Sequence, residues 1–468
     1  MENKQSLSSP AGERENIMGT MDINPLLIKL SVPMMVSMLV QALYNVVDSI
    51  FVSHVSESAL TAVSLAFSLQ NVMIAVGVGT GVGVNALLSK SLGEKRQDRA
   101  NAAAMNGLFL AAVSYLVFML IGLTCSRLFF AIQTDKQTIV DYGESYMFIV
   151  CVLSVGMFFQ ITFERILQAT GRTLYTMFTQ ALGAIINIVL DPILIFGLFG
   201  LPRMEVAGAA LATVLGQIIA ALVSVVINAT RNPDVQLSLK GFRPQASIIG
   251  HIYAVGVPSI IMSSIGSVMV FGMNKILIAF TTTATAVFGV YFKLQSFVFM
   301  PVFGLNNGMV PIVAYNYGAR NPQRVRRAFK VLLIACVTYS LTLWALVQLF
   351  PQIFALLFTP NQELVDYAAW ALRIYMAATG IFGVQVACQQ TFVALGNAKT
   401  SLFLAALRKI ILLIPLIFIL PHFFADKSFA VFLAEPVADV LAVCTTATMF
   451  FFLFRKSMAA LEGPSVGA

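Results

Sequence analysis

The stretch LGEKRQDRANAA, residues 92–103, returns in altered form as YGARNPQRVRRA, residues 317–328, which lies 225 positions further along the chain. The same offset places the tripeptide Val-Asp-Tyr at 140–142 on its second copy at 365–367, without a gap. Other identities at this offset are Pro33 with Pro258, Gln70 with Gln295, Phe129 with Phe354, Thr134 with Thr359, Gln137 with Gln362, Ala169 with Ala394 and Gly171 with Gly396. A register held over this length predicts that one structural unit occurs twice.

The composition of the chain indicates which solvent surrounds the repeated unit. Of the 468 residues, 58% are hydrophobic and 11% are charged, and the mean hydropathy is +0.86. A water-soluble chain cannot bury so much apolar surface, whereas apolar runs of about 20 residues are typical of membrane helices. We find twelve such runs, at roughly 26–52, 59–87, 101–124, 144–167, 175–200, 206–228, 252–280, 284–313, 328–350, 365–392, 401–421 and 429–454. The expected fold class is an all-α integral membrane protein with twelve transmembrane helices.

Each copy of the repeat contains six of these runs. Because six is an even number, both copies enter the membrane from the same side, and the two six-helix lobes form a parallel repeat. The predicted organisation is a polar tail over 1–24, a first lobe over 25–228, a linker over 229–250, a second lobe over 251–455 and a tail over 456–468. In secondary transporters, such lobes commonly rock against each other around a central site.

Basic residues are distributed unevenly between the two sides of the membrane. If the N-terminus is cytoplasmic, most of the charges behind the net charge of +8 fall in inner connections, namely Lys90, Lys95, Arg96, Arg99, Arg172, Arg231, Lys240, Arg243, Arg320, Arg324, Arg326, Arg327, Lys330, Lys399, Arg455 and Lys456. The outer connections hold little beyond Arg127, Lys136, Arg203 and Lys427. This positive-inside bias predicts a multi-pass protein of the plasma (inner) membrane with both termini cytoplasmic. No segment is long enough for a soluble basic domain that would bind nucleic acid.

The sequence lacks the motifs that would indicate several other classes of protein. The first 24 residues lack the apolar core of a signal peptide, and the five cysteines show neither metal-ligand spacing nor a disulfide framework. The sequence contains no P-loop, zinc motif or G-x-S-x-G motif, so we expect no nucleotide-driven pump, no membrane-embedded enzyme and no cofactor. Two fused halves suit alternating access better than a pore built from several subunits, so we expect a functional monomer.

Asp141 and Asp366, from the two Val-Asp-Tyr copies, are expected to lie at helix starts, where the helix dipole stabilises their negative charge.

Comparing the two copies identifies polar residues within the spans that only the first lobe carries. One face of span one holds Ser37, Gln41, Tyr44, Asn45 and Asp48, whose counterparts in the second lobe are Met262, Gly266, Met269, Val270 and Met273. In span five, Asn187 and Asp191 lie one helical turn apart, and their counterparts are Leu412 and Leu416. Helix packing alone therefore does not require these polar residues, and the first lobe has a task that the second lacks.

The chemistry of these residues suggests that they bind a cation. A carboxylate at membrane depth costs at least about 3 kcal/mol, so Asp48 and Asp191 are functional candidates by default. Two neighbouring carboxyl groups can share one proton near neutral pH. Together with the amide oxygen of Asn187, they also offer the oxygen ligands that a sodium ion prefers. Pro192 follows Asp191 directly, and a kink there would let protonation bend the helix. The alternatives are that Asp48 lies at the membrane interface and that Asp191 makes a structural hydrogen bond.

Four stretches of the chain resemble a known transporter family. They are SVPMMVSMLVQALYNVVDSIFVSHV at 31–55, LGEKRQDRA at 92–100, ILQATGRT at 166–173 and NIVLDPILI at 187–195. In their order and spacing they resemble the multidrug and toxic compound extrusion (MATE) transporters, in particular the MepA-like branch. The resemblance extends over roughly residues 20–455. It implies two six-helix lobes that export large amphipathic, often cationic compounds in exchange for protons or sodium ions.

The resemblance also assigns roles to individual residues. The positions that match Asp48, Asn187 and Asp191 belong to the cation-binding site of the first lobe in this family, and Tyr44 and Gln41 match residues beside that site. Thr213, in the stretch AALATVLGQ, resembles the threonine that completes it. This chain departs from family members that carry acids in spans seven and ten. Its span seven contains no acid and its span ten, after Asp366, offers only Arg373, so a second-lobe ion site is not expected.

The second lobe carries a different set of charges. These are Lys275, Lys293, Arg373, Arg408 and Lys409, with Glu435 and Asp439 in span twelve. Some of the bases can snorkel to the interface and others can pair with the span-twelve acids. If several of them instead face a central cavity unpaired, the substrate would be anionic. The alternative function is then a flippase or exporter of an anionic lipid-linked precursor on a related scaffold.

The walls of a substrate site are less clearly marked in the sequence. The chain contains 37 Phe and 21 Met, which provide the large, adaptable apolar surface that promiscuous binding requires. The expected substrate-contacting residues are Gln70 and Gln295, matched across the lobes in spans two and eight, with Phe67, Phe292 and Asn45. The expected partners are amphipathic small molecules and the lipid bilayer.

Overall fold

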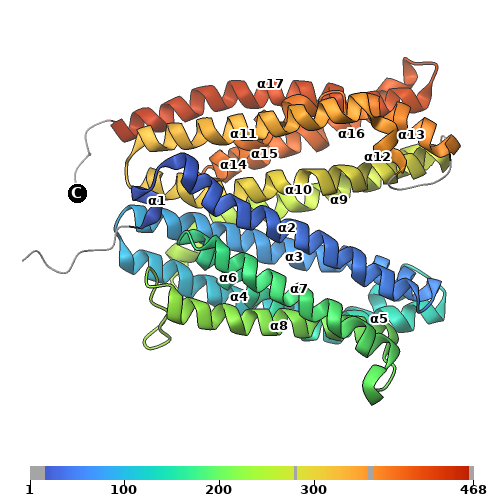
Figure 1. Ribbon diagram of the computed structural model, residues 1–468, viewed down its shortest axis with the longest axis horizontal. Helices are drawn as coiled ribbons and strands as arrows, with labels where there is room; N and C mark the ends of the chain where they lie inside the picture. Colours follow the sequence, from blue (N-terminus) through green and yellow to red (C-terminus); the bar gives the residue numbers. More distant parts are fainter. Residues whose placement is uncertain (1–15, 279–281, 357–361, 463–468) are drawn as a thin grey trace, which may run out of the picture.

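The computed structural model describes residues 16–278, 282–356 and 362–462 (Figure 1). Every regular element in these ranges is helical. The side chains of Lys275, Phe292, Lys293 and Gln295, all singled out by the sequence, lie outside the description.

The helices form two consecutive sets, one for each lobe. The first set comprises α1 (Ile17–Thr20), α2 (Ile23–Ser53), α3 (Glu57–Gly93), α4 (Gln97–Ala131), α5 (Gln137–Val152), α6 (Val155–Ala169), α7 (Thr173–Phe196), η1 (Leu198–Gly200) and α8 (Glu205–Arg231). The second set comprises α9 (Ala246–Ile278), α10 (Thr282–Gly318), α11 (Pro322–Leu349), α12 (Pro351–Leu356), α13 (Gln362–Tyr375), α14 (Thr379–Ala394), α15 (Ala398–Ala406), η2 (Leu407–Leu413), α16 (Ile414–Ile419), η3 (Leu420–His422) and α17 (Lys427–Glu462).

The sequence repeat is also a structural repeat. Adding 225 to the bounds of α3 gives the bounds of α10, and both helices are 37 residues long. The fourth span of each lobe is broken at the same place, with a bend of 46° between α5 and α6 and of 52° between α13 and α14. The described residues contain nine long apolar helices and these two bent pairs, and α10 provides a further span. The prediction of twelve spans in two lobes is thus confirmed.

The two lobes lie side by side along the long axis of the molecule. In Figure 1 the first lobe (blue to green) lies below the second lobe (yellow to red), and α1 and the C-terminal end of α17 lie at the left. We call this the terminal end, and the other the opposite end. The lobes meet at the terminal end, and α2 and α10 diverge toward the opposite end.

Glycines allow the lobes to approach closely at the terminal end. Gly93 on α3 faces the carbonyl oxygen of Tyr315 on α10, and Gly318 faces the carbonyl oxygen of Lys90. Neither glycine has room for a Cβ atom, because the facing backbone occupies that position. Further along, Ser31 Oγ on α2 donates to the carbonyl oxygen of Leu305 on α10 at 3.0 Å. These contacts close one end of the space between the lobes.

Some element boundaries differ from those expected. The last residues of the predicted tail over 1–24 form α1 and the start of α2, and α17 extends to Glu462. The linker is shorter than predicted, because α8 ends at Arg231 and α9 begins at Ala246. Helix α7 continues through Pro192 up to Phe196.

Asp141 and Asp366 are not helix-start residues, contrary to expectation. Helix α5 begins at Gln137 and α13 at Gln362, so each Asp lies in the second turn. There it accepts a hydrogen bond from the glutamine one turn earlier, at 2.9 Å in the first lobe and 3.2 Å in the second. The repeated phrase therefore encodes a repeated side-chain contact on the helix surface.

Candidate functional site

Three helices of the first lobe bring the predicted polar residues together. The spacing of four places Asn187 and Asp191 on one face of α7, which packs against α2 and α8. Asn187 Nδ2 donates to Thr213 Oγ1 of α8 at 3.1 Å and to Asp191 Oδ1 at 3.4 Å. From α2, Asp48 and Tyr44 complete the group, which we call the acid cluster.

The two carboxyl groups of the acid cluster interact directly. Asp48 and Asp191 are close enough to influence each other directly, and two neighbouring carboxyl groups can form a hydrogen bond to each other when one of them is protonated. Asp191 is fully buried at 0% exposure. Among the described residues, no N–H or hydroxyl group donates to Asp48 Oδ1, Asp191 Oδ2 or Asn187 Oδ1. The cluster therefore has oxygen acceptors that a proton or another small cation can satisfy.

Tyr146 of α5 belongs to the same group, and the sequence analysis missed it. Its side chain is 3% exposed and lies near Tyr44 and Asp48. Its hydroxyl group donates to Gln70 Oε1 at 3.5 Å. The counterpart of Tyr146 in the second lobe is Ala371, so the comparison that found Asp48 would also have found it in span four.

A cavity of about 630 Å³ lies next to the acid cluster, and both lobes line it. From the acid cluster and its surroundings, Gln41, Tyr44, Asn187 and Thr213 reach its wall. The second lobe contributes Ser259, Met262, Met300, Phe303, Asn307 and Gln390. Five methionines line the cavity, namely Met34, Met38, Met157, Met262 and Met300. The wall is thus adaptable and apolar, with amide and hydroxyl groups set into it.

An adjacent acid and base on α6, also missed by the sequence analysis, line this cavity. Glu164 is 3% exposed, and its carboxylate accepts hydrogen bonds from three neutral side chains. The donors are Gln160 Nε2 at 2.9 Å, Thr179 Oγ1 at 3.0 Å and Gln180 Nε2 at 2.8 Å. The first lobe thus places a carboxylate in the cavity wall itself, separate from the acid cluster, whose two carboxyl groups do not line the cavity.

Arg165 connects the two lobes across the cavity wall. Its Nη1 donates to Gln168 Oε1 at 2.9 Å and to Asn307 Oδ1 of α10 at 3.4 Å. The counterparts of Glu164 and Arg165 in the second lobe are Gln389 and Gln390, so the charges occur in one copy only. This is the sequence signal that could have found both residues.

Three predicted substrate-contacting residues do not line the described cavity. On α3 the lining begins at Ile74, so Gln70 and Phe67 lie one to two turns too far toward the opposite end. Gln70 accepts the hydrogen bond from Tyr146 instead, and the Phe67 side chain is 56% exposed. Asn45 is exposed on α2, because the position after Tyr44 turns about 100° away from the face that carries Gln41 and Tyr44.

The charges of the second lobe form a closed group that we call the charge quartet. Lys409 Nζ lies 2.6 Å from Glu435 Oε1, and Arg408 Nη2 lies 3.2 Å from the same oxygen. Arg408 Nε lies 2.5 Å from Asp439 Oδ1. All four side chains are at most 12% exposed. The predicted pairing of these bases with the span-twelve acids is therefore correct for Arg408 and Lys409.

The structural context of the charge quartet differs from that of the acid cluster. Both bases lie on η2, a single stretch of π-helix that interrupts span eleven. The guanidinium group of Arg408 also lies 4.1 Å from the centre of the Phe382 ring. Arg373, in contrast, is exposed. In the ranges that the structure describes, no group of three or more His, Cys, Asp and Glu side chains is arranged to hold a metal ion.

Two repeated six-helix lobes around a central cavity, with ionisable groups inside the membrane, are typical of transporters. The MatE family model matches residues 33–193 and again residues 258–419, so the two matches begin 225 residues apart. Because these matches cover more than half of the chain, the chain belongs to the multidrug and toxic compound extrusion (MATE) family.

Similar proteins of known name agree with this assignment. The multidrug export protein MepA of Staphylococcus haemolyticus is 24% identical over 416 residues, which are 88% of this chain and 91% of the relative. An FAD transporter of Shewanella oneidensis is 24% identical over 422 residues, 90% of this chain and 92% of the relative. A solved outward-facing conformation of a multidrug resistance MATE family transporter of the MOP superfamily superposes with a TM-score of 0.88 at 25% identity, covering 97% of this chain and all of that one. The resemblance to MepA-like MATE transporters is thus confirmed.

Proposed function

We propose that this chain is a secondary antiporter that exports amphipathic, often cationic compounds in exchange for protons or sodium ions, by alternating access of its two lobes. The observation that carries the proposal is the acid cluster, which lies against a cavity lined by both lobes. We place the terminal end in the cytoplasm, because the basic connections gather there. The chain would act as a monomer in the plasma membrane, since one chain supplies both lobes.

Coupling requires that the cation and the substrate influence each other. Asn187 and Thr213 line the cavity, and Asn187 also contacts Asp191. A substrate that displaces these side chains changes the hydrogen bonds available to the carboxyl pair. A proton that enters the pair would in turn change the wall that the substrate meets, and this reciprocity is what exchange requires.

The proximity of Asp48 and Asp191 favours a proton as the coupling ion, because two neighbouring carboxyl groups with no base among their described contacts can share one. Sodium is the alternative. The three oxygens without a donor, one each from Asp48, Asn187 and Asp191, are hard ligands that suit such an ion.

The cavity wall indicates what kind of substrate it binds. Its methionines can adjust to different shapes, which suits varied amphipathic compounds. The preference for cations is supported by the acid cluster beside the cavity and not by Glu164 in the wall itself, because Glu164 has Arg165 next to it. The relative named MepA, a multidrug export protein, supports the same cargo class.

Export of an anionic compound, such as a lipid-linked precursor, is the second candidate. Arg165 lines the cavity, and one relative of equal identity is named as a transporter of FAD, which is anionic. Against it, Arg408 and Lys409 are paired with acids of the charge quartet and are not available to such a substrate.

Transport by the purified protein in liposomes tests the proposal. We would impose a pH gradient or a sodium gradient and follow a cationic dye and an anionic lipid in parallel. Dye movement driven by one gradient supports the antiporter and identifies the ion. Movement of the anionic lipid alone, with no effect on dyes, would establish the second candidate instead.

A further inference from the structure

Two short segments cross between the lobes at the terminal end. Each precedes the first span of one lobe and binds the other lobe. The first, the N-terminal strap, comprises residues 16–21 and precedes α2. The second, the linker strap, comprises residues 232–245 and precedes α9. The repeat offset places residues 16–20 on 241–245, so the N-terminal strap matches the last part of the linker strap.

The N-terminal strap is held by the second lobe through its backbone. Arg324 Nη2 of α11 donates to the carbonyl oxygens of Met18 at 3.0 Å and Met21 at 2.6 Å. Asn316 Nδ2 of α10 donates to the Met18 oxygen at 3.0 Å, and Arg324 Nε donates to Asn316 Oδ1 at 2.8 Å. The Met18 side chain is fully buried in a core built largely from α10 and α11.

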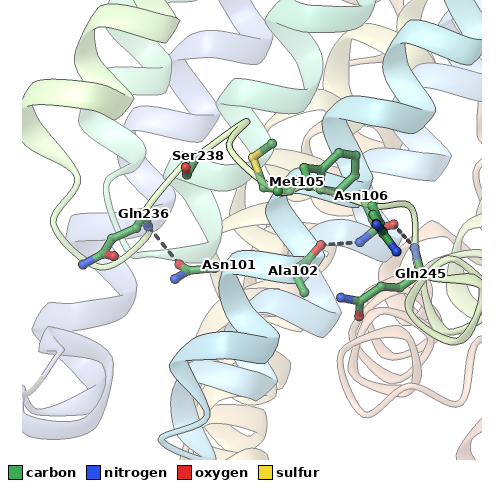
Figure 2. A pocket seen from close by; sticks show the side chains of 10 residues that line it. Asn101, Ala102, Met105, Asn106, Gln236, Ser238 and Gln245 are labelled. Atoms are coloured by element: carbon green, nitrogen blue, oxygen red, sulfur yellow. Dashed lines mark hydrogen bonds between the residues drawn. The ribbon is translucent and has the colours of Figure 1, made fainter.

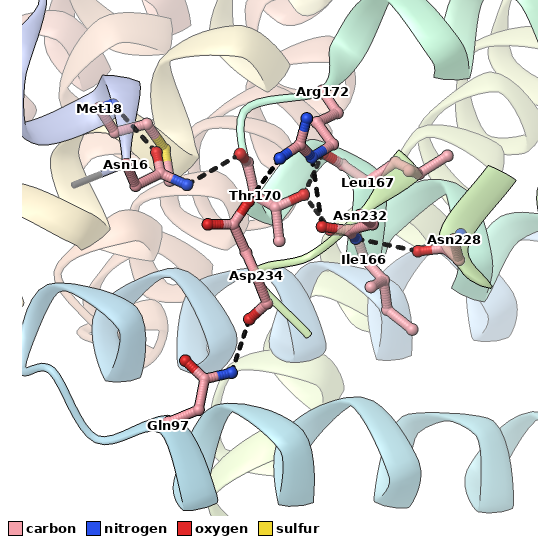
Figure 3. A network of polar contacts seen from close by, with 10 residues as sticks. All are labelled: Asn16, Met18, Gln97, Ile166, Leu167, Thr170, Arg172, Asn228, Asn232 and Asp234. Carbon is pink, nitrogen blue, oxygen red and sulfur yellow. Dashed lines mark hydrogen bonds and ion pairs between the residues drawn. The ribbon is translucent and has the colours of Figure 1, made fainter. Parts of the chain in front are cut away.

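The same strap is also bound to the first lobe. Asn16 Nδ2 donates to the carbonyl oxygen of Thr170, at the end of α6, at 3.1 Å (Figure 3). Asn16 Oδ1 in turn accepts from the backbone N–H of Met18, which fixes the start of α1. Six residues thus connect α6 of one lobe to α10 and α11 of the other.

The linker strap is bound to α4 of the first lobe. Figure 2 shows Asn101 Oδ1 accepting from the backbone N–H of Gln236 at 2.8 Å, and Asn106 Oδ1 accepting from that of Gln245 at 2.9 Å. Gln97 Nε2 donates to the carbonyl oxygen of Asp234 at 2.7 Å. Because Gln245 directly precedes α9, the start of the second lobe is tied to the first.

Arg172 fixes the other end of the linker strap. Its Nη2 lies 2.8 Å from Asp234 Oδ2, and its Nε donates to Asn232 Oδ1 at 3.3 Å (Figure 3). The linker is therefore an ordered part of the first lobe.

We propose that the N-terminal strap is a latch that holds the terminal end closed, with Arg324 and Asn16 as its two attachment points. To open the cavity toward the terminal end, α6 must separate from α10 and α11, and the strap cannot remain bound to both lobes. The hydrogen bonds of Arg324 or of Asn16 must therefore break in each cycle. The inference rests on the proposed alternating access of the two lobes.

Comparison of the two copies of the repeat shows that an arginine at the position of Arg324 does not have to bind the strap for the helices of a lobe to pack. The counterpart of Arg324 in the first lobe is Arg99, which lies 3.5 Å from Glu94 of its own lobe. The same position thus makes a local ion pair in one copy and holds the strap in the other. Arg324 is a positioning residue for the lobes and does not line the cavity.

Distances between spin labels test the latch directly. The label sites are Asp98 and Gln323, which are exposed, related by the repeat offset and located at the terminal end. A second pair at Lys136 and Gln352 reports on the opposite end. The five native cysteines are first replaced by alanine, and the labelled protein is placed in lipid nanodiscs.

We expect Arg324→Ala to raise the ratio of open to closed distances at the terminal end about tenfold, which corresponds to about 1.4 kcal/mol. The labels at the opposite end should move closer together in the same variant. Arg327→Ala is the matched control, because it removes the same charge from an exposed position on the same helix and should leave both distance distributions unchanged.

Unchanged distances in Arg324→Ala would overturn the latch, as would an equal change in Arg327→Ala. If Arg324→Ala does not fold, Asn16→Asp carries the same test, since it removes the donor to Thr170 and keeps the side-chain oxygen that accepts from the backbone N–H of Met18. Its open population should rise in the same direction by a smaller factor, and no rise would overturn the latch. The distances are measured without transport, so absence of dye efflux would refute the proposed function and leave the latch intact.

Discussion

The acid cluster of the first lobe and the charge quartet of the second lobe both place carboxylates inside the membrane, yet their electrostatics are opposite. In the acid cluster, Asp48 and Asp191 face each other with no base among their described contacts. In the charge quartet, two acids face two bases at 2.5 to 3.2 Å. The first group lacks positive charge that a cation can supply, whereas the second is already neutral.

This difference separates a binding site from a structural one. A buried charge needs a partner, and the partner can be a fixed side chain or a mobile ion. The charge quartet uses fixed partners and so holds α17 to span eleven. The acid cluster leaves three oxygens without a donor, which is the condition for reversible binding. Buried acids therefore indicate function in this molecule only where the neighbouring bases are missing.

The largest expected effect is on coupling. Asp191→Asn and Asp48→Asn should each reduce gradient-driven dye efflux to the background rate, because an amide cannot take up and release a proton and is a poorer sodium ligand. Both variants should fold with an unchanged or slightly higher melting temperature, since a costly buried charge is removed. Efflux from liposomes and thermal melting provide the two measurements. Wild-type efflux in Asp191→Asn would show that coupling lies elsewhere, with Glu435 and Asp439 as the next candidates.

The charge quartet should respond in the opposite way. Lys409→Met leaves a buried negative charge with one partner fewer, which should cost about 3–5 kcal/mol of folding stability. The double variant Lys409→Met/Glu435→Gln restores the balance and should recover most of the melting temperature. The efflux that remains per folded molecule should still follow the imposed gradient. A Lys409→Met protein that melts like the wild type but loses its gradient dependence would place coupling in the second lobe.

A smaller effect is expected for the link between the acid cluster and the cavity. Thr213→Val keeps the shape of the side chain but removes the acceptor of Asn187 Nδ2, and a lost buried hydrogen bond costs about 1–3 kcal/mol. Efflux should fall several-fold and depend less steeply on the gradient. Thr230→Val, at an exposed position of the same helix, is the control. Equal efflux in both variants would contradict a coupling role for Thr213.

The smallest effect is expected for Asp141 and Asp366, the acids that occupy matching positions in the two lobes. Asp141 lies 3.6 Å from Arg127 on an exposed surface, and such pairs contribute about 0–1 kcal/mol. Asp141→Asn and Asp366→Asn should leave both efflux and melting temperature close to those of the wild type. A strong loss of efflux in either variant would mean that acids present in both copies also take part in transport.

The sequence alone determined the architecture of this protein. The apolar runs and the offset of 225 residues predicted two lobes of six spans, because a membrane admits little other than helices of that length. The one-copy comparison also predicted the acid cluster, since a costly polar residue that its repeat partner lacks cannot be explained by packing. Applied to span four, the same comparison would have included Tyr146, Glu164 and Arg165.

Only the tertiary structure decided which residues meet across elements. Gln70 and Phe67 are identical to their counterparts in the second copy of the repeat, but the residues of α3 that line the cavity begin one to two turns later, at Ile74. No sequence pattern shows at which turn of a helix the cavity begins. The pairing of Arg408 with Asp439 depends on how span eleven packs against span twelve. The strap at residues 16–21 had the composition of a loose tail, and its order comes from Arg324 and Asn316, about 300 positions away. Local composition sets which segments enter the membrane, whereas contacts between distant segments depend on packing geometry that composition does not encode.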